Sequence, residues 1–330
     1  MSIIFLGGNY SQFANTSGGV STNTSAFNTA FAKYALFARS DNTTAASLLS
    51  TASEWWFHCV YYNIDTNNSG VALINFTIGG NYGYSLYTTT ATTVRMAVWT
   101  GGAWSTVSAN YATLAEGPKY TIDLFFKPHA SNGTAKMYID GVLISEDTGI
   151  ALMADDGATI DGVIVRGNYP TISGGAYYSE MVMTDAEAES TIGWHVSTIL
   201  PTAAGATSGW TGAYTDIDEA VLNTDDYIST DTDATVSTFA FGNLDASVAS
   251  DLVVGVYVST VLAKTVGASV SSIDLVVRPS STNYFPDNSG ALAEGPVTNY
   301  KTSLLVNPET GVAWTVAGVE GCEFGFRANT

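Results

Sequence analysis

Gly117-Pro118-Lys119-Tyr120-Thr121-Ile122-Asp123-Leu124-Phe125-Phe126 is followed along the chain by Asn132-Gly133-Thr134-Ala135-Lys136-Met137-Tyr138-Ile139-Asp140-Gly141-Val142-Leu143-Ile144. The first run has large apolar residues at positions 120, 122, 124 and 126, so a strand would place all four on one face. In the second run, Asp140-Gly141 separates two apolar stretches and offers the residue types that a two-residue hairpin turn requires. The two runs therefore predict neighbouring antiparallel strands.

A similar pattern of apolar runs and turn residues extends along the whole chain. Apolar runs of five to eight residues alternate with clusters of Gly, Asn and Asp, which is typical of all-β proteins. We expect strands at residues 54–62, 71–78, 82–88, 93–100, 120–127, 134–139, 142–145, 159–166, 177–183, 226–229, 236–241, 251–258, 272–278, 301–306 and 322–327. Residues 185–192 favour a short helix, with Thr184 or Asp185 as its N-cap. Residues 26–38 fit either a helix or a strand.

Length and composition predict two folded domains. The chain has 330 residues, of which 46% are hydrophobic and 12% aromatic, enough to fill a substantial core. Single cores stop growing at about 250–300 residues. Residues 200–209 are small and rich in Gly and Pro, as expected of an extended linker or long loop. We predict antiparallel β-sandwich domains at 1–195 and 196–330, the second smaller.

The charge of the chain limits its partners. The formal net charge is −19, and both halves are acidic: residues 1–195 have 15 acidic and 7 basic side chains, and residues 196–330 have 15 and 4. Such a surface repels phosphate, so neither nucleic acid nor an anionic membrane is an expected partner. No run of 18 apolar residues occurs, and the first residues do not resemble a signal peptide. We therefore expect synthesis in a cytoplasm and no membrane insertion.

Both halves contain segments that suggest a resemblance to known families. The paired runs at 117–126 and 132–144 are similar to strands of concanavalin-A-like or laminin-G-like jelly rolls, over about residues 1–190. The segments 177–183, 210–219, 305–315 and 319–325 resemble structural proteins of tailed bacteriophages. This resemblance implies a virion component of the tail or capsid surface, made in the host cytoplasm, with host-surface binding as one role.

Enzymatic motifs are missing from the sequence. His58, His129 and His195 form no pair with metal-ligand spacing, and there is no Gly-x-Ser-x-Gly elbow, P-loop or dinucleotide fingerprint. A glycosidase needs two carboxylates on either side of a sugar. The nearest candidates are the adjacent pairs Glu146-Asp147 and Asp155-Asp156, in expected loops, and adjacent acids in a strand would face opposite ways.

Acidic loop residues raise the question of calcium, which prefers oxygen ligands. Asp231 and Asp233 are the candidate metal ligands, although none of the acidic clusters continues into an EF-hand loop and most such clusters in an acidic chain are solvated surface. We expect no other cofactor. The cysteines Cys59 and Cys322 fall in different predicted domains, so a disulfide between them is not expected.

Aromatic residues around the Gly101-Gly102 turn are the candidate ligand-binding residues. Trp99, Trp104 and Tyr111 could present flat apolar faces on which a sugar ring stacks. The alternative is that Trp99 belongs to the core and Trp104 covers it. In the pair Trp55-Trp56, one ring should lie in the core and the other should pack against a second layer or a partner.

These observations predict a non-enzymatic virion structural protein that binds other virion proteins, forms a homo-oligomer and acts as a host-surface glycan adhesin. A capsid decoration protein is one alternative, and a glycan-degrading enzyme of the jelly-roll class is a second. A secreted lectin would need an export route. Because subunits of like charge repel each other, we expect their association to strengthen with salt.

Overall fold

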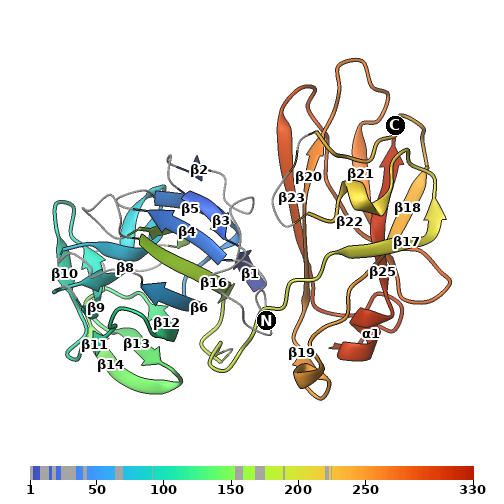
Figure 1. Ribbon diagram of the computed structural model, residues 1–330. Helices are drawn as coiled ribbons and strands as arrows, with labels where there is room; N and C mark the ends of the chain where they lie inside the picture. The colour runs from blue at the N-terminus through green and yellow to red at the C-terminus, as the bar shows by residue number, and fades with distance from the viewer. Residues whose placement is uncertain are drawn as a thin grey trace. The chain divides into compact units, whose positions relative to one another are not determined.

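The computed structural model describes residues 3–7, 15–16, 20–23, 35–39, 43–63, 70–90, 92–152, 159–167, 175–188, 190–219, 223 and 225–330. The chain divides into two compact units, residues 1–196 and 197–330 (Figure 1). Both are built from antiparallel sheets, so the prediction of an all-β, β-sandwich fold is confirmed. Within the described ranges, no helix has the length and apolar character needed to span a membrane.

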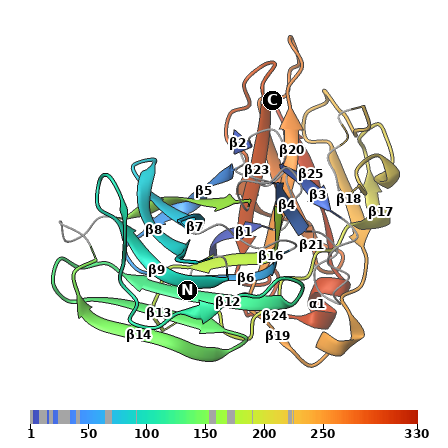
Figure 2. The ribbon, with the colours of Figure 1, turned by 60° about the vertical axis from the view of Figure 1, so that its left-hand side comes forward.

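Unit 1 is a sandwich of two sheets that face each other across the core (Figure 2). Sheet A has the order β14-β13-β12-β6-β16-β4-β3, with β1 also paired to β16, and sheet B has the order β10-β9-β8-β7-β15-β5-β2, with β11 also paired to β9. Sheet A comprises β1 Ile3–Gly7, β3 Val20–Asn23, β4 Ala35–Arg39, β6 Trp55–Asn63, β12 Lys119–Lys127, β13 Gly133–Ile139, β14 Val142–Ile150 and β16 Gly175–Thr184. Sheet B comprises β2 Asn15–Thr16, β5 Thr43–Ala52, β7 Ala72–Ile78, β8 Asn81–Thr88, β9 Thr93–Trp99, β10 Trp104–Thr106, β11 Ala112–Thr113 and β15 Ile160–Arg166.

Aromatic rings fill the centre of the unit 1 core. Trp55 is fully buried and stacks on Phe126 at 5.6 Å between ring centroids, while its contact with Tyr84 of the opposite sheet is edge-to-face at 5.2 Å. The alternation at 120–126 buries Ile122, Leu124 and Phe126 in this core. Because such rings bury a large apolar area, they account for much of the stability of the sandwich.

The hairpin between β13 and β14 forms at the predicted residues. Ile139 pairs with Val142, and both turn residues have positive φ, 52° at Asp140 and 74° at Gly141. This is the conformation of a type I′ turn, whose twist suits an antiparallel pair. The Asp140 carboxylate also accepts a hydrogen bond from the Thr121 N–H at 2.8 Å, which ties the turn to β12.

Residues 185–188 and 190–196, here called the strap, follow β16. The predicted helix at 185–192 is wrong for the described residues, which form turns and irregular backbone. The Glu187 carbonyl accepts a hydrogen bond from the Trp56 indole at 2.9 Å, and the Glu187 N–H donates to the Glu54 carboxylate at 3.0 Å. In a helix the Glu187 carbonyl would accept the N–H of Thr191, whereas here it accepts the Trp56 indole N–H. Trp55 therefore lies in the core and Trp56 on the opposite face of sheet A, against the strap.

Unit 2 is a five-stranded sheet with a long two-stranded ribbon packed against its core. The sheet order is β17-β18-β25-β21-β22, and β20-β23 and β19-β24 form separate pairs. The elements are β17 Pro201–Ser208, η2 Tyr214–Asp216, β18 Val236–Phe241, η3 Ala246–Val248, β19 Leu252–Val253, β20 Val256–Ala263, β21 Ser272–Arg278, β22 Tyr284–Asn288, β23 Val297–Leu304, β24 Trp314–Thr315, α1 Val316–Glu320 and β25 Glu323–Asn329. Leu275 and Phe324 of the sheet share a core with Tyr300 and Leu304 of the ribbon.

Three expectations about local structure are corrected, and one open alternative is resolved for the described residues. Residues 200–209 are not a linker, because β17 occupies most of them and pairs with β18. The segment 226–229 contributes only a single bridge, between Ser229 and Thr211. Residues 251–258 are divided between β19 and β20. Of residues 26–38, the described part begins the strand β4 rather than a helix.

Candidate functional site

Strands β8, β9 and β10 are neighbours in sheet B, and β11 also pairs with β9 (Figure 1). The alternation and register of these strands place a group of aromatic residues on the outward face of the sheet. Val94 and Met96 of β9 are fully buried in the core. Successive strand residues point to opposite faces, so Arg95 and Trp99 of the same strand point outward. The strand alternation therefore keeps these two side chains out of the core.

The strand register brings further residues to this face. Trp104 of β10 lies directly opposite Trp99, and Tyr87 of β8 lies directly opposite Arg95. Tyr111 immediately precedes Ala112, which pairs with Val94, so Tyr111 lies beside Arg95. We call these five residues the aromatic patch: Tyr87, Arg95, Trp99, Trp104 and Tyr111.

The rings of the patch contact one another. Trp99 and Trp104 meet edge-to-face with 5.2 Å between ring centroids, and Trp104 lies 6.1 Å from Tyr87. The Arg95 guanidinium stands 5.6 Å from the centroid of the Tyr111 ring, a cation–π distance. These contacts hold the rings in fixed orientations before any ligand arrives.

The patch is accessible in part. The exposed fraction of Tyr111 is 55%, whereas Trp99 and Trp104 are each half-buried. The row of outward positions between Trp104 and Tyr87 holds Ser85 and Ala97, both buried and both small. Because small side chains leave room above the sheet, the Trp104 ring can cross this row to reach Tyr87.

The strand register thus places the three sequence-predicted aromatic residues on one face. It adds one further aromatic residue, Tyr87, and one cationic residue, Arg95, to that face. Trp99 lies outside the core, and the Trp104 ring packs against the Trp99 ring. Tyr87 and Arg95 were not among the predicted residues. The alternation from Thr93 to Trp99 could have identified Arg95, but the register that sets Tyr87 beside it depends on pairing between strands.

A buried polar cluster lies on the outward face of sheet A, under the strap. His58 Nδ1 lies 2.8 Å from Asp123 Oδ1, and the Thr191 hydroxyl donates to the same oxygen at 2.8 Å. All three residues are fully buried. In a catalytic triad the hydroxyl nucleophile bonds to the imidazole, and the imidazole bonds to the carboxylate. Here the Thr191 hydroxyl bonds directly to the Asp123 carboxylate, so the three residues do not form a triad. The cluster therefore anchors the strap.

The other two histidines also have structural contacts. His129 Nδ1 accepts hydrogen bonds from the N–H groups of Ser131 and Asn132, at 3.1 and 3.0 Å, in the turn before β13. His195 Nδ1 lies 3.1 Å from the buried Glu180 carboxylate, which also accepts the Val196 N–H. The second of these pairs fixes the end of the strap.

The candidate carboxylate pairs are placed as follows. Glu146 and Asp147 lie in β14, not in the loop that the sequence predicted. Glu146 pairs with Lys136 at 3.3 Å. Asp147 accepts hydrogen bonds from the Ala109 N–H at 3.0 Å and the Ser145 hydroxyl at 2.6 Å. Each acid is thus engaged in a structural contact. The pair Asp155-Asp156 lies outside the described residues.

The candidate calcium ligands are both exposed on unit 2. Asp233 accepts a hydrogen bond from the Thr330 N–H at 2.8 Å, and this contact with the end of the chain lowers the pKa of the Asp233 carboxyl. The Asp231 carbonyl accepts the Ser269 hydroxyl at 2.6 Å. In the described ranges, no three His, Cys, Asp or Glu residues gather in an arrangement that could hold a metal ion. Calcium at Asp231 and Asp233 stays a prediction.

Comparison with known proteins gives fold-level likeness only. No family model matches the chain, and no curated protein matches it. Among solved structures, a mutant of alginate lyase Aly36B in complex with alginate tetrasaccharide has 14% identity and a TM-score of 0.37, covering 46% of this chain and 81% of that one.

Two further solved structures have similar scores. Cellulose induced protein Cip1 has 10% identity and a TM-score of 0.40, covering 53% of this chain and 88% of that one. Domain 4 of AbnA, a GH43 extracellular arabinanase from Geobacillus stearothermophilus, in complex with arabinotriose, has 13% identity and a TM-score of 0.37, covering 55% and 82%. At these values the likeness carries no argument about a ligand of this chain.

Proposed function

We propose that this chain is a non-enzymatic protein that binds a neutral glycan through the aromatic patch of unit 1. The observation that carries the proposal is the contact between Trp99 and Trp104 on the outward face of sheet B, the face that also carries the exposed Tyr111. Clustered aromatic rings outside a core are typical of binding surfaces.

The chemistry of the patch suits sugars. Aromatic faces present flat apolar area to the C–H faces of a pyranose ring at little cost in side-chain entropy. Arg95 carries guanidinium N–H groups, which are hydrogen-bond donors suited to hydroxyl groups. The patch therefore combines stacking surfaces with a hydrogen-bond donor.

The charge of the chain favours a neutral glycan over an acidic one. Residues 1–195 carry 15 acidic and 7 basic side chains, so the field around the unit repels carboxylate and sulfate groups. Arg95 is the single cation of the patch, which has four exposed or half-buried rings. We therefore expect neutral hexose polymers to bind more tightly than polyuronates.

The placement of the acids supports a binding role rather than catalysis. Glycoside hydrolysis uses two carboxylates that face one sugar from opposite sides. Glu146 is paired with Lys136, and both Asp147 oxygens accept hydrogen bonds from the protein. Adjacent positions of one strand also direct the two acids to opposite faces. We propose that no sugar is released from any glycan that binds.

A panel of soluble glycans tests the proposal. Dextran, mannan, a β-1,3-glucan and a galactan serve as neutral polymers, and alginate serves as the acidic one, with binding scored by affinity electrophoresis of the full chain. We expect retardation by at least one neutral polymer. Tyr111→Ala should weaken it, whereas Tyr227→Ala, which removes another exposed tyrosine from unit 2, should not. Retardation by alginate alone would contradict the neutral assignment.

The biological setting rests on the resemblance to virion proteins. We propose that the glycan belongs to a host surface and that the protein, as a homo-oligomer, presents unit 1 from a tail or capsid. Sedimentation of the purified protein with host cells, and separately with capsids that lack it, tests this setting. Saturable binding to host cells supports a role as an adhesin if treatment of the cells with glycosidases abolishes that binding. Binding to capsids alone would instead assign a decoration role.

A further inference from the structure

A cavity opens in sheet B where β5 separates from β15. Ser47 pairs with Gly162, and Ala52 pairs with Ile160. Between these two pairs, β5 has the four residues 48–51, whereas β15 has only Asp161. The additional residues of β5 must arch away from the sheet, because they have no partners on β15. We call the resulting opening the β5 pocket.

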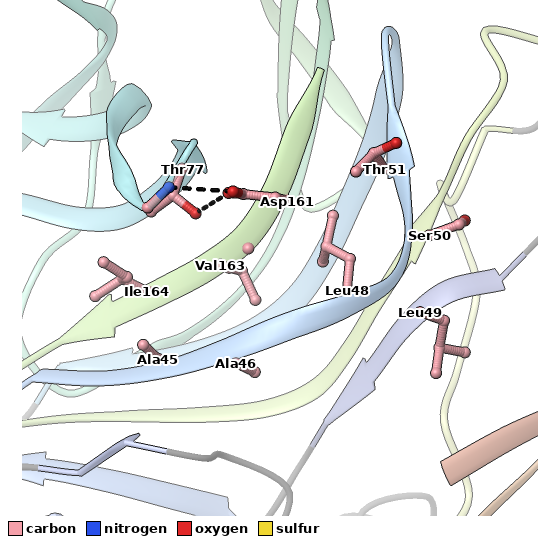
Figure 3. A pocket seen from close by; sticks show the side chains of 12 residues that line it. Ala45, Ala46, Leu48, Leu49, Ser50, Thr51, Thr77, Asp161, Val163 and Ile164 are labelled. Carbon is pink, nitrogen blue, oxygen red and sulfur yellow. Dashed lines mark hydrogen bonds between the residues drawn. The ribbon is translucent and has the colours of Figure 1, made fainter. Parts of the chain in front are cut away.

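The β5 pocket has the size and lining of a ligand site. Its volume is about 510 Å³, within the range of about 300–1,000 Å³ that small-molecule pockets occupy. Figure 3 shows Leu48 and Ile164 on its apolar walls and Asp161 beside Thr77. Leu49, at the arch, is 41% exposed. The Asp161 carboxylate, with the Thr77 hydroxyl bonded to it, thus lies beside the apolar side chains of Leu48 and Ile164.

The Asp161 carboxylate is held in position and retains acceptor capacity. Its Oδ1 accepts the Thr77 hydroxyl at 2.7 Å, and its Oδ2 accepts the Gly80 N–H at 3.1 Å. Gly162 permits this approach, because a Cβ there would lie 2.6 Å from Thr77 Oγ1. A carboxylate has about four lone-pair sites, so two remain. Among the described residues, no Lys, Arg or His side chain forms an ion pair with Asp161.

Part of the pocket lining lies on the same face of sheet B as the aromatic patch, although Leu48 and Val163 of the pocket pack in or against the core. Phe76 and Val98 are packed in or against the core, so Thr77 and Trp99, the next residues of their strands, point outward. Four steps between neighbouring strands separate β10 from β15. At about 4.8 Å per step, the two sites are roughly 19 Å apart. An extended oligosaccharide that crosses the strands can reach both.

We infer that the β5 pocket binds one neutral sugar residue of the glycan whose other residues stack on the aromatic patch, with the Asp161 carboxylate accepting its hydroxyl groups. The fixed negative charge favours hydroxyl donors and disfavours a uronic acid. The apolar walls suit the C–H face of a pyranose. This inference rests on the proposed function and extends it to a second site.

The test follows the two sites separately in the full chain. Methyl signals of Leu48, Leu49 and Ile164 report on the pocket, and tryptophan fluorescence reports on the patch. The probes are D-glucose, D-galactose, D-mannose and oligosaccharides of increasing length from the neutral polymer that retards the protein most. We expect the pocket methyl signals to shift with the sugar and the affinity to increase when the oligosaccharide becomes long enough to span both sites.

Variants at the arch make the test specific. Leu49→Trp narrows the pocket at an exposed position. It should lower the affinity for the long oligosaccharide about tenfold. The affinity of the aromatic patch for a short oligosaccharide should not change. Leu143→Trp is the matched control, because Leu143 is an exposed leucine of sheet A. Asp161→Asn should lower the affinity for the long oligosaccharide as well.

The outcomes distinguish the two proposals. Tryptophan fluorescence that titrates while the pocket methyl signals stay fixed would overturn the pocket site and leave the aromatic patch in place. Pocket signals that respond to calcium chloride but to none of the sugars would overturn the assignment of a sugar ligand. If neither reporter responds to any neutral sugar, both the pocket site and the proposed function fail.

Discussion

Single residues in this protein stabilise elements far from them in the sequence, and Asp123 is the clearest example. Its carboxylate bonds to His58 in β6 and to Thr191 in the strap, and all three residues are buried. The sequence places Asp123 on the outward face of β12 by alternation. It does not indicate that the strap returns to cover that face, because the contact joins residues 68 positions apart.

We predict that Asp123→Ala lowers the free energy of unfolding of unit 1 by roughly 2–4 kcal/mol, because it leaves the buried His58 and Thr191 groups without their acceptor. Urea denaturation of the full chain, followed by circular dichroism, measures the change. Glu116→Ala is the control, since Glu116 is exposed in the same unit and its loss should cost less than about 0.5 kcal/mol. Equal midpoints for the two variants would contradict the anchoring role.

A second carboxylate links the stability of unit 2 to pH. Burial of Asp274 favours its neutral form, but hydrogen bonds from Asn288 and Arg327 outweigh that effect and hold the pKa of the carboxyl below its usual value. Arg327 Nε lies 2.8 Å from Asp274 Oδ2, and the Arg327 guanidinium stands 3.8 Å from the centroid of the Phe285 ring. The ion pair therefore joins β21, β22 and β25.

Because the folded pKa is lowered, the stabilisation from Asp274 is present above the unfolded pKa of about 3.9 and is lost as the pH falls through the lower folded value. We predict that wild type exceeds Asp274→Asn by about 1–2 kcal/mol in free energy of unfolding at pH 7, and that the gap closes in strong acid. Urea unfolding across this pH range measures the gap. A gap that stays constant with pH would rule out the titration of Asp274 as its cause.

At the scale of elements, alternating strands were predicted well and edge elements poorly. The strands at 236–241 and 272–278 have the predicted bounds. In the second strand, Ile273, Leu275 and Val277 alternate as a strand requires. β17 was missed because Pro, Ala and Gly have low strand propensity, and its pairing with β18 supplies what its own sequence lacks. The extension of β14 through Glu146 and Asp147 likewise depends on pairing with β13.

The β13–β14 turn offers a local test of the fold. We predict that Gly141→Ala destabilises unit 1 by about 1–2 kcal/mol, because Gly141 has a φ of 74°, which an L-residue with a Cβ adopts at a cost. No packing clash contributes, since the nearest atom to a Cβ there is 4.0 Å away. Thermal unfolding should show a lower midpoint for this variant.

Gly102→Ala is the matched control for the turn variant, because Gly102 has an ordinary φ and open space around its Cα. It should unfold at the wild-type temperature. If Gly102→Ala and Gly141→Ala unfold together, the turn conformation assigned to Asp140 and Gly141 is wrong.

Features of the candidate sites that depend on pairing between strands could likewise not be predicted from the sequence. Trp99, Trp104 and Tyr111 could be proposed from the sequence, because aromatic residues gather around one Gly-Gly turn. Tyr87 joined them only through the register of β8 and β9. The β5 pocket could not be predicted at all, since it depends on a mismatch in length between β5 and β15 that appears only when both are paired.

At the scale of the whole molecule, net charge governs association. The formal charge of −19 makes copies of this chain repel each other, so any contact between them must use apolar or polar patches. If the chain forms the proposed homo-oligomer, we predict that association between copies strengthens as sodium chloride screens this repulsion. Sedimentation velocity at low and high salt measures the effect, and an oligomer that dissociates at high salt would contradict it.

The measurement that tests the central claim most directly is a titration of the full chain with the neutral polymer that retards it most, comparing wild type, Trp104→Ala and Tyr227→Ala by isothermal calorimetry. Trp104 contacts both Trp99 and Tyr87, so its loss removes the centre of the aromatic patch. We predict that Trp104→Ala loses at least about tenfold in affinity and that Tyr227→Ala binds like wild type. Equal affinity of all three proteins would contradict glycan binding through the aromatic patch.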